Sequence, residues 1–322
     1  MDALKLSRRH FLALGAAGVL LPSRPAFAEG DSTPKSGGHA IEKGPLRLTP
    51  LEIPVGASRP FTVLHASDSH LNFMTVDDLN DTKYGDLLEF YRARRTMDAM
   101  PPLAALVKEA RTRKLPVFHT GDLIDYESQA NLSLARQSFA GVDVLFAPGN
   151  HEYVGHWGRK APNWSECREA RQRIGRFFPN DLTVASRVIN GVNFVAFDNG
   201  GLSFGLEKQQ LAAIKKEFAK GLPLVLLCHL PLYTKELYVA FTESTGPRAG
   251  EKSVKKETMP WILCGMHAAE KPLLAYLAKQ PLLKAVLCGH LHREYQFAFT
   301  DSVTQYVADA TYKGNAYEIT FS

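Results

Sequence analysis

Cysteines are scarce in this chain of 322 residues, which has only four of them. No two are spaced as C-x-x-C, which argues against a zinc site built from thiolates. In an oxidising compartment the four could form one or two disulfides, and their spacing does not assign partners. Cys228 and Cys288 each end an apolar run, so we expect both to be small buried side chains. The other two are Cys167 and Cys264.

The net positive charge is also low over most of the chain. The formal net charge is +5, and the first 28 residues supply most of it, because four basic residues there face a single acidic one. The remainder is nearly neutral. Binding to a nucleic-acid backbone needs a concentrated basic face, so we do not expect nucleic acid as a partner.

An apolar run long enough to cross a membrane is missing from the N-terminus. Paired Arg8 and Arg9 precede the eleven-residue run Phe11–Leu21, whereas a membrane-spanning helix needs about 20 residues. Residues 26–28 (Ala-Phe-Ala) then offer the small-x-small pattern that a signal peptidase accepts. The stretch resembles a twin-arginine export signal, so we predict a signal peptide at residues 1–28. No stable membrane anchor is expected. The twin-arginine translocase would deliver the folded chain to the periplasm or the exterior of a bacterium.

Short apolar runs and helical patterns alternate along the rest of the chain. Residues 29–59 are rich in Gly, Pro, Ser and Thr and are interpreted as a lead-in segment, which leaves residues 60–322 as one folded domain. Helical patterns occur at Leu103–Ala110 and at Leu211–Phe218. This alternation predicts an α/β layered fold with buried strands that helices cover. The strand-length runs are Phe61–Ala66, Leu115–His119, Val142–Ala147, Val192–Phe197, Leu222–Cys228 and Lys284–Cys288.

Three stretches depart from the alternation. Residues 294–321 hold apolar residues without a helical pattern, which predicts closing antiparallel strands. Residues 71–100 and 232–270 are interpreted as insertions, because long loops in a compact domain are usually functional or mobile. We expect these two insertions to set the substrate preference.

Polar residues gather where five of the apolar runs end. An α/β sheet has its binding crevice at the carboxyl ends of its strands, so we expect these residues to meet at one edge. A single block of this kind is weak evidence, whereas no packing requirement explains five in succession. The blocks are Asp68-Ser69-His70, Gly121-Asp122, Gly149-Asn150-His151-Glu152, His229 and Gly289-His290-Leu291-His292.

In chain order, these blocks resemble the D-x-H, G-D-x-x-D, G-N-H-[DE], H and G-H-x-H motifs of the calcineurin-like metallophosphoesterase superfamily. The resemblance covers nearly all of residues 61–322. It implies a four-layer αββα sandwich, in which two mixed sheets are flanked by helices. It also implies a dinuclear metal centre. The first metal is assigned to Asp68, His70 and His292, the second to Asn150, His229 and His290, and Asp122 is assigned to both.

The donor set restricts the chemistry without choosing the metal. Imidazole and carboxylate suit first-row divalent or trivalent ions, so manganese, iron and zinc all remain open. A shared carboxylate lets two cations lie about 3.5–4 Å apart. The resemblance implies that a hydroxide bridging the two metals attacks phosphorus in line, without a covalent enzyme intermediate.

Two further residues receive roles from the motifs. The family pattern leaves His151 off the metals, and we assign it the proton of the leaving group. Asp125, the second aspartate of G-D-x-x-D, is expected to orient that imidazole. Purple acid phosphatases have a tyrosine where Asp125 stands, so no tyrosinate-to-iron colour is expected. Related protein phosphatases have an arginine where this chain has Tyr126, which disfavours a phosphoprotein substrate.

The remaining histidines are expected to do less. His65 and His119 lie inside apolar runs and are interpreted as hydrogen-bonded core or near-site residues. His156, Trp157 and His267 are candidates for lining a substrate pocket. No serine stands in a pattern that favours a serine nucleophile.

The sequence therefore predicts an exported phosphoric ester hydrolase with two metal ions, acting on small phosphomonoesters or phosphodiesters. Relatives of the 5'-nucleotidase type carry a C-terminal nucleotide-binding domain, for which we expect no room before Ser322. Two alternatives stay open: a metal-dependent nuclease, and a metal-binding or ligand-binding member of the fold that lacks turnover.

Overall fold

The computed structural model describes residues 46–80, 99–153, 164–200, 208–237 and 271–322. The predicted signal peptide and most of the predicted lead-in lie outside the described residues, as do most of both predicted insertions. So do His156, Trp157, His267 and Cys264. Within the described ranges, no helix combines the length and the apolar character that crossing a membrane requires.

The first of two sheets holds the strands that precede four of the seven predicted ligands. Its strands, in spatial order, are β1 (Arg47–Ile53), β11 (Asn315–Phe321), β2 (Phe61–Ala66), β3 (Val117–His119) and β4 (Val144–Phe146). β2, β3 and β4 run parallel, whereas β11 is antiparallel to β2 and parallel to β1. The carboxyl ends of β2, β3 and β4 therefore meet at one edge.

The second sheet repeats this arrangement with six strands. They are, in spatial order, β5 (Val184–Ile189), β6 (Val192–Phe197), β7 (Leu224–Leu227), β8 (Leu283–Cys288), β10 (Val303–Val307) and β9 (Tyr295–Thr300). The four central strands are parallel, and β5 and β9 are antiparallel to their neighbours. Both sheets are mixed, as predicted.

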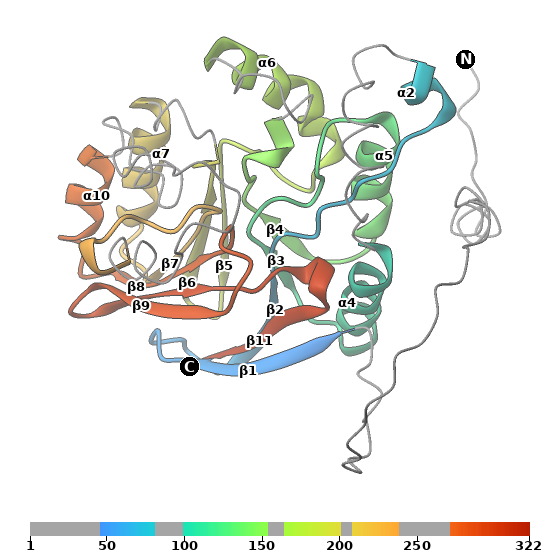
Figure 1. Ribbon diagram of the computed structural model, residues 1–322. Helices are drawn as coiled ribbons and strands as arrows, with labels where there is room; N and C mark the ends of the chain where they lie inside the picture. Colours follow the sequence, from blue (N-terminus) through green and yellow to red (C-terminus); the bar gives the residue numbers. More distant parts are fainter. Residues whose placement is uncertain (1–45, 81–98, 154–163, 201–207, 238–270) are drawn as a thin grey trace, which may run out of the picture. The chain divides into compact units, whose positions relative to one another are not determined.

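Helices cover the outer face of each sheet (Figure 1). Those on the first sheet are α4 (Met100–Arg113), α5 (Gln129–Ser138) and α6 (Trp164–Ile174), and those on the second are α7 (Lys208–Phe218) and α10 (Lys271–Leu277). Leu103 of α4 belongs to one outer core with Leu64, and Ile214 of α7 belongs to the other with Val286.

A third core lies between the two sheets. The rings of Phe118 from β3 and Phe194 from β6 have their centroids 4.7 Å apart there. Helix, sheet, sheet and helix thus form four layers, which confirms the predicted α/β sandwich. The shorter elements are α2 (Val76–Asn80) and the 3₁₀ turns η2 (His151–Tyr153), η3 (Gly175–Phe177) and η4 (Thr311–Lys313).

Local signals explain why the predicted runs form these elements. The runs Phe61–Ala66 and Val192–Phe197 coincide with β2 and β6, and all of β6 is buried, as expected for a strand covered on both faces. Helix α4 has prolines in its first turn, where the missing N–H costs nothing. In the tail, β9 with β10 and β11 with β2 supply the predicted antiparallel pairs.

The predicted lead-in at residues 29–59 needs a correction, because its second half is part of the fold. Arg47–Ile53 forms β1 and pairs with β11 along its whole length, and Ile53 and Val55 are buried in the core between the sheets. Pro50 obscured the strand in the sequence. Since β1 is an edge strand with a single neighbour, a proline is tolerated there.

Candidate metal centre

Loops after five parallel strands bring the seven predicted ligands to one edge of the two sheets. Asp68 and His70 follow β2, Asp122 follows β3, Asn150 follows β4, His229 follows β7, and His290 and His292 follow β8. Asp68, His70, Asp122 and His229 are almost completely buried. Loops scattered over more than two hundred residues of sequence thus converge, as the blocks predicted.

Most of these ligands have an unusual backbone conformation. Seven described residues other than glycine have positive φ, and five of them are predicted ligands: Asp68, His70, Asp122, His290 and His292, with φ between 49° and 69°. A left-handed conformation costs about 1 kcal/mol or more for such residues. Its concentration here indicates that the surrounding structure holds these side chains in place against local strain.

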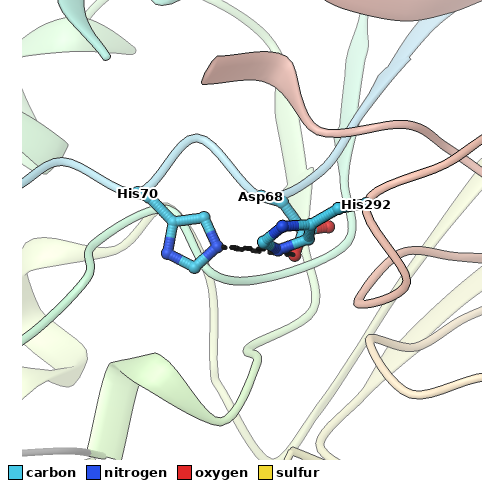
Figure 2. Close-up of side chains that lie close together, drawn as sticks. All are labelled: Asp68, His70 and His292. Atoms are coloured by element: carbon cyan, nitrogen blue, oxygen red, sulfur yellow. Dashed lines mark hydrogen bonds and ion pairs between the residues drawn. The ribbon is translucent and has the colours of Figure 1, made fainter. Parts of the chain in front are cut away.

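Asp68, His70 and His292 form the first cluster (Figure 2). The Nε2 atoms of His70 and His292 lie 3.1 Å apart, and Nε2 of His292 lies 3.0 Å from Oδ1 of Asp68. Asp68 Oδ1 is buried, and no well-aligned hydrogen bond reaches it in spite of this short distance. Three ligand atoms therefore face a common point, and metal–nitrogen bonds of about 2.0–2.1 Å fit such spacing.

Asp122, His229 and His290 form the second cluster. Nε2 of His229 lies 3.1 Å from Oδ2 of Asp122 and 3.2 Å from Nδ1 of His290. The side-chain oxygen of Asn150 is buried and has no hydrogen-bond partner among the described residues. A buried amide oxygen without a donor is costly, and a cation bound beside it would remove that cost.

One carboxylate oxygen lies between the two clusters. Oδ2 of Asp122 is 3.1 Å from Nε2 of His229 and 3.8 Å from Nε2 of His70. Its other oxygen accepts a hydrogen bond from the backbone N–H of His151 at 2.8 Å. Asp122 is therefore positioned to serve both clusters, and the residues present fit a dinuclear centre.

Hydrogen bonds at Nδ1 show which imidazole nitrogen each ligand presents. Nδ1 of His70 donates to Asp125 Oδ1 at 2.9 Å, and Nδ1 of His229 donates to the Thr120 carbonyl at 2.7 Å. Both residues therefore offer Nε2 to the cluster. His290 differs, since its Nδ1 is the atom that faces His229.

His151 and Asp125 form a pair at the edge of the clusters. Nδ1 of His151 lies 2.9 Å from Asp125 Oδ1, and its Nε2 lies 4.0 Å from Asp122 Oδ2. The ring therefore presents Nε2 toward the metal ligands, and with His70 and Asp122 it forms a third group whose ligand atoms all lie within 4.8 Å of one another. Asp125 Oδ1 also accepts the hydrogen bond from His70, a second link that the motif pattern did not predict.

Opposite charges set the protonation of these groups when no metal is bound. Burial opposes protonation of His229, but the Asp122 carboxylate outweighs it and raises the pKa of His229 to about 9. For His70 burial is likewise outweighed, chiefly by Asp125, which raises the pKa well above its usual value. Burial alone would raise the pKa of Asp68. The nearby histidines, His292 above all, outweigh burial and hold this pKa well below the usual range.

Glycines allow the loops to approach one another this closely. A Cβ at Gly289 would lie 1.7 Å from Ser67 Oγ and 2.6 Å from Asp68 Oδ2. A Cβ at Gly149 would lie 2.2 Å from Asp122 Oδ1. Both contacts are closer than real side chains permit, so no other residue fits at these positions without displacing a ligand.

Glu152 is a positioning residue. It belongs to the Gly-Asn-His-Glu block, but the sequence analysis predicted no role for it. Its fully buried carboxylate accepts hydrogen bonds from the backbone N–H groups of Asp122, Leu123, Ile124 and Gly149. Burial and the nearby Asp122 carboxylate raise the pKa of Glu152 to about 7. Glu152 thus joins the loop after β3 to the loop after β4.

A sixth strand end also contributes and was missed. Asn199 follows β6, and its Oδ1 accepts hydrogen bonds from the backbone N–H groups of His229 and Leu230. The adjacent Asp198 accepts a hydrogen bond from the Tyr153 hydroxyl at 2.8 Å. The signal was present in the sequence, because Asp198-Asn199 follows a buried apolar run like the other five blocks.

His65 and His119 lie where the sequence predicted, as hydrogen-bonded residues near the site. His65 and His119 are fully buried and donate or accept one hydrogen bond each, to Thr120 and to Ser69. Burial lowers the pKa of each to about 3, so both are neutral near-site residues. Cys228 and Cys288 are buried thiols.

The chain is similar to known proteins of one family. Residues 61–294 match the family model described as calcineurin-like phosphoesterase. A dimetal phosphatase from Danio rerio has 13% identity, covers 79% of this chain and 88% of its own, and has a TM-score of 0.45. No curated protein matches the chain.

Two other solved structures are larger. A purple acid phosphatase from yellow lupin seeds has 17% identity, with 80% of this chain and 45% of that chain covered and a TM-score of 0.45. A putative 5'-nucleotidase from Staphylococcus aureus has 14% identity, with 79% and 49% covered and a TM-score of 0.42. This chain thus spans about half the length of both.

Proposed function

The chain belongs to the calcineurin-like phosphoesterase family, and on that premise we propose that it hydrolyses small phosphomonoesters or phosphodiesters. It is a metal-dependent phosphoesterase with an intact set of candidate ligands. The observation that carries the proposal is the position of Asp122, whose Oδ2 lies within 4 Å of a histidine from each cluster.

The seven predicted ligands would hold two ions. Asp68, His70 and His292 would bind the first, and Asn150, His229 and His290 the second, with Asp122 shared. Ions bound there would supply a nucleophile near neutral pH and would neutralise charge on the phosphoryl oxygens. The burial of Asp68, Asp122 and His229 excludes bulk water from the inner side of this site.

His151 would supply the proton that the leaving group needs. Burial opposes its protonation, but the carboxylates of Asp122 and Asp125 outweigh burial and raise its pKa. This shift favours the protonated imidazole. Its Nδ1 contacts Asp125, at the backbone carbonyl (2.8 Å) and at the carboxylate (2.9 Å), which leaves Nε2 to donate. A protonated imidazole of this kind is suited to general acid catalysis.

We also propose that the protein is exported. The support is the leader itself, in which paired arginines precede a short apolar run and an Ala-Phe-Ala site. The signal peptide at residues 1–28 and the partnership with the twin-arginine translocase are part of this proposal. Fractionation of cells expressing the chain, with Arg8→Lys and Arg9→Lys as the control, would test it.

An assay with bis-nitrophenyl phosphate and nitrophenyl phosphate in the presence of Mn²⁺, Zn²⁺ or Fe²⁺ tests the enzymatic proposal. We expect hydrolysis that a His229→Ala variant loses. Metal binding without hydrolysis over any of the ions would support a non-catalytic binder instead. Release of nucleotides from single-stranded DNA would support a nuclease.

A further inference from the structure

Three histidines of the site present Nε2 to the clusters, and each has a hydrogen-bond partner at Nδ1. The partner is the Asp125 carboxylate for His70 and the Thr120 carbonyl for His229. For His292 it is the hydroxyl oxygen of Tyr312, 3.2 Å from Nδ1. A neutral imidazole that presents Nε2 to a metal must carry its proton on Nδ1, so His292 donates to Tyr312.

Tyr312 also contacts the other two residues of the first cluster. Its backbone N–H donates to the Asp68 carbonyl at 3.3 Å. Its ring packs edge-to-face against His70, with centroids 5.7 Å apart, and against His292, with centroids 5.3 Å apart. One residue therefore touches all three members of the first cluster.

The turn that carries Tyr312 is itself fixed to the site. In η4, the N–H of Thr311 donates to the Ser67 carbonyl at 2.8 Å, and the Thr311 hydroxyl accepts from the N–H of Ser67 at 3.3 Å. The ammonium group of Lys313 donates to the His292 carbonyl and forms an ion pair with Asp309 at 3.0 Å. The turn thus ties the loop after β2 to the loop after β8.

His292 needs such support more than His70 and His229 do. Its side chain is 33% exposed, whereas that of His70 is 3% and that of His229 is 0% exposed. Packing fixes the ring plane of a buried histidine, but a third-exposed ring is held mainly by its own hydrogen bond. The partner of a ligating histidine also fixes its tautomer.

From these contacts the structure assigns Tyr312 as a positioning residue for the first metal position. Its hydroxyl fixes the tautomer and ring plane of His292 so that Nε2 faces Asp68 and His70. This assignment rests on the proposed function, because it takes the clusters to be metal ligands. Tyr312 does not touch the reacting atoms. Its removal weakens metal binding at one position and not at the other.

The test uses Tyr312→Phe, which keeps the ring contacts and removes only the hydroxyl. Tyr276→Phe is the matched control, since Tyr276 lies on α10 and packs against Phe218. Wild type and variants are stripped of metal and titrated with Co²⁺, followed by calorimetry and visible absorption. His292→Ala and His290→Ala show which binding step belongs to which position.

We expect Tyr312→Phe to weaken, by about 10- to 100-fold, the binding step that His292→Ala removes. The step that His290→Ala removes should keep its affinity, and Tyr276→Phe should match wild type at both. Without metal, Tyr312→Phe should melt at the wild-type temperature, because the hydroxyl serves the ligand and not the fold.

Two results overturn the inference alone. One is a wild type that binds two ions and hydrolyses phosphoesters while Tyr312→Phe binds both ions equally well. The other is an equal weakening of both steps with a lower melting temperature of the metal-free variant, which makes the role of Tyr312 purely structural. A wild type that binds no Co²⁺ and hydrolyses no phosphoester overturns the proposed function, and this inference with it.

Discussion

Asp125 accepts a hydrogen bond from Nδ1 of His70 at 2.9 Å, through the same Oδ1 atom that lies 2.9 Å from Nδ1 of His151. The predicted proton donor and a predicted ligand of the first metal therefore contact one carboxylate oxygen, and Nδ1 of His151 also lies 2.8 Å from the Asp125 backbone carbonyl. This carboxylate is buried, and the protonated histidines hold its pKa below the usual range against the effect of burial. A change at Asp125 should consequently affect catalysis and metal binding together.

Replacing Asp125 by Asn should lower turnover and weaken the first metal position by about tenfold or more. The amide has the shape of the carboxylate but lacks the charge that raises the pKa of both imidazoles. Metal content by mass spectrometry and the rate of nitrophenyl phosphate hydrolysis measure the two effects. Asp143→Asn is a suitable control, since Asp143 is half exposed and pairs with Arg187. Full metal content with lost turnover would restrict Asp125 to its role on His151.

His151→Ala should separate the effect on turnover from the effect on metal binding. We expect turnover to fall by about 10² to 10⁴, the usual contribution of a positioned general acid, while both metal ions stay bound. The reason is that the seven proposed ligands do not include His151, whose Nε2 lies 4.0 Å from Asp122 Oδ2, farther than the Nε2 of His229 at 3.1 Å. Substrates with a good leaving group, such as nitrophenol, should lose less activity than alkyl phosphates. A variant that loses a metal ion would place His151 among the ligands.

The sequence predicted the strands and the site because both depend on local patterns. Buried parallel strands such as β6 are continuous apolar runs, and polar residues directly after them must lie at a sheet edge. The side chains of Asp68, His229 and His292 could therefore be assigned to one place before any distance was known.

What the sequence did not show depends on contacts between distant segments. β1 is stabilised by pairing with β11, which lies more than 260 residues later, and its own composition is that of a loop. Tyr312 stands in a short turn with no motif, and only the packing of η4 against Ser67 and Asp68 brings it to His292. The double role of Asp125 likewise follows from the distance between two loops.

Gly289→Ala should disrupt the first metal position. The added Cβ would meet Ser67 Oγ at 1.7 Å and Asp68 Oδ2 at 2.6 Å, so the loop after β8 must move away from Asp68. We expect a loss of about 1–3 kcal/mol in stability, as for other overpacked sites, together with loss of one bound ion. Denaturant unfolding and metal analysis measure both. Gly175→Ala is the control, because its Cβ meets nothing within 4 Å.

Metal binding should release protons, and its affinity should rise with pH up to about pH 9. In the metal-free protein, the pKa of His229 is raised to about 9, so at pH 7 this imidazole holds a proton that an incoming ion must displace. Each displaced proton makes the apparent affinity about tenfold higher per pH unit. Calorimetry in buffers of different ionisation enthalpy counts the protons.

The same shift sets the pH dependence of stability without metal. A histidine whose folded pKa lies above its unfolded value of about 6.5 stabilises the folded state fully below that value. This contribution disappears as the pH rises through 9. The metal-free protein should therefore lose stability between pH 7 and 9, and His229→Gln should flatten that loss. If wild type and His229→Gln show the same slope, and metal binding releases no proton, His229 is neutral in the metal-free site and Asp122 does not hold its proton.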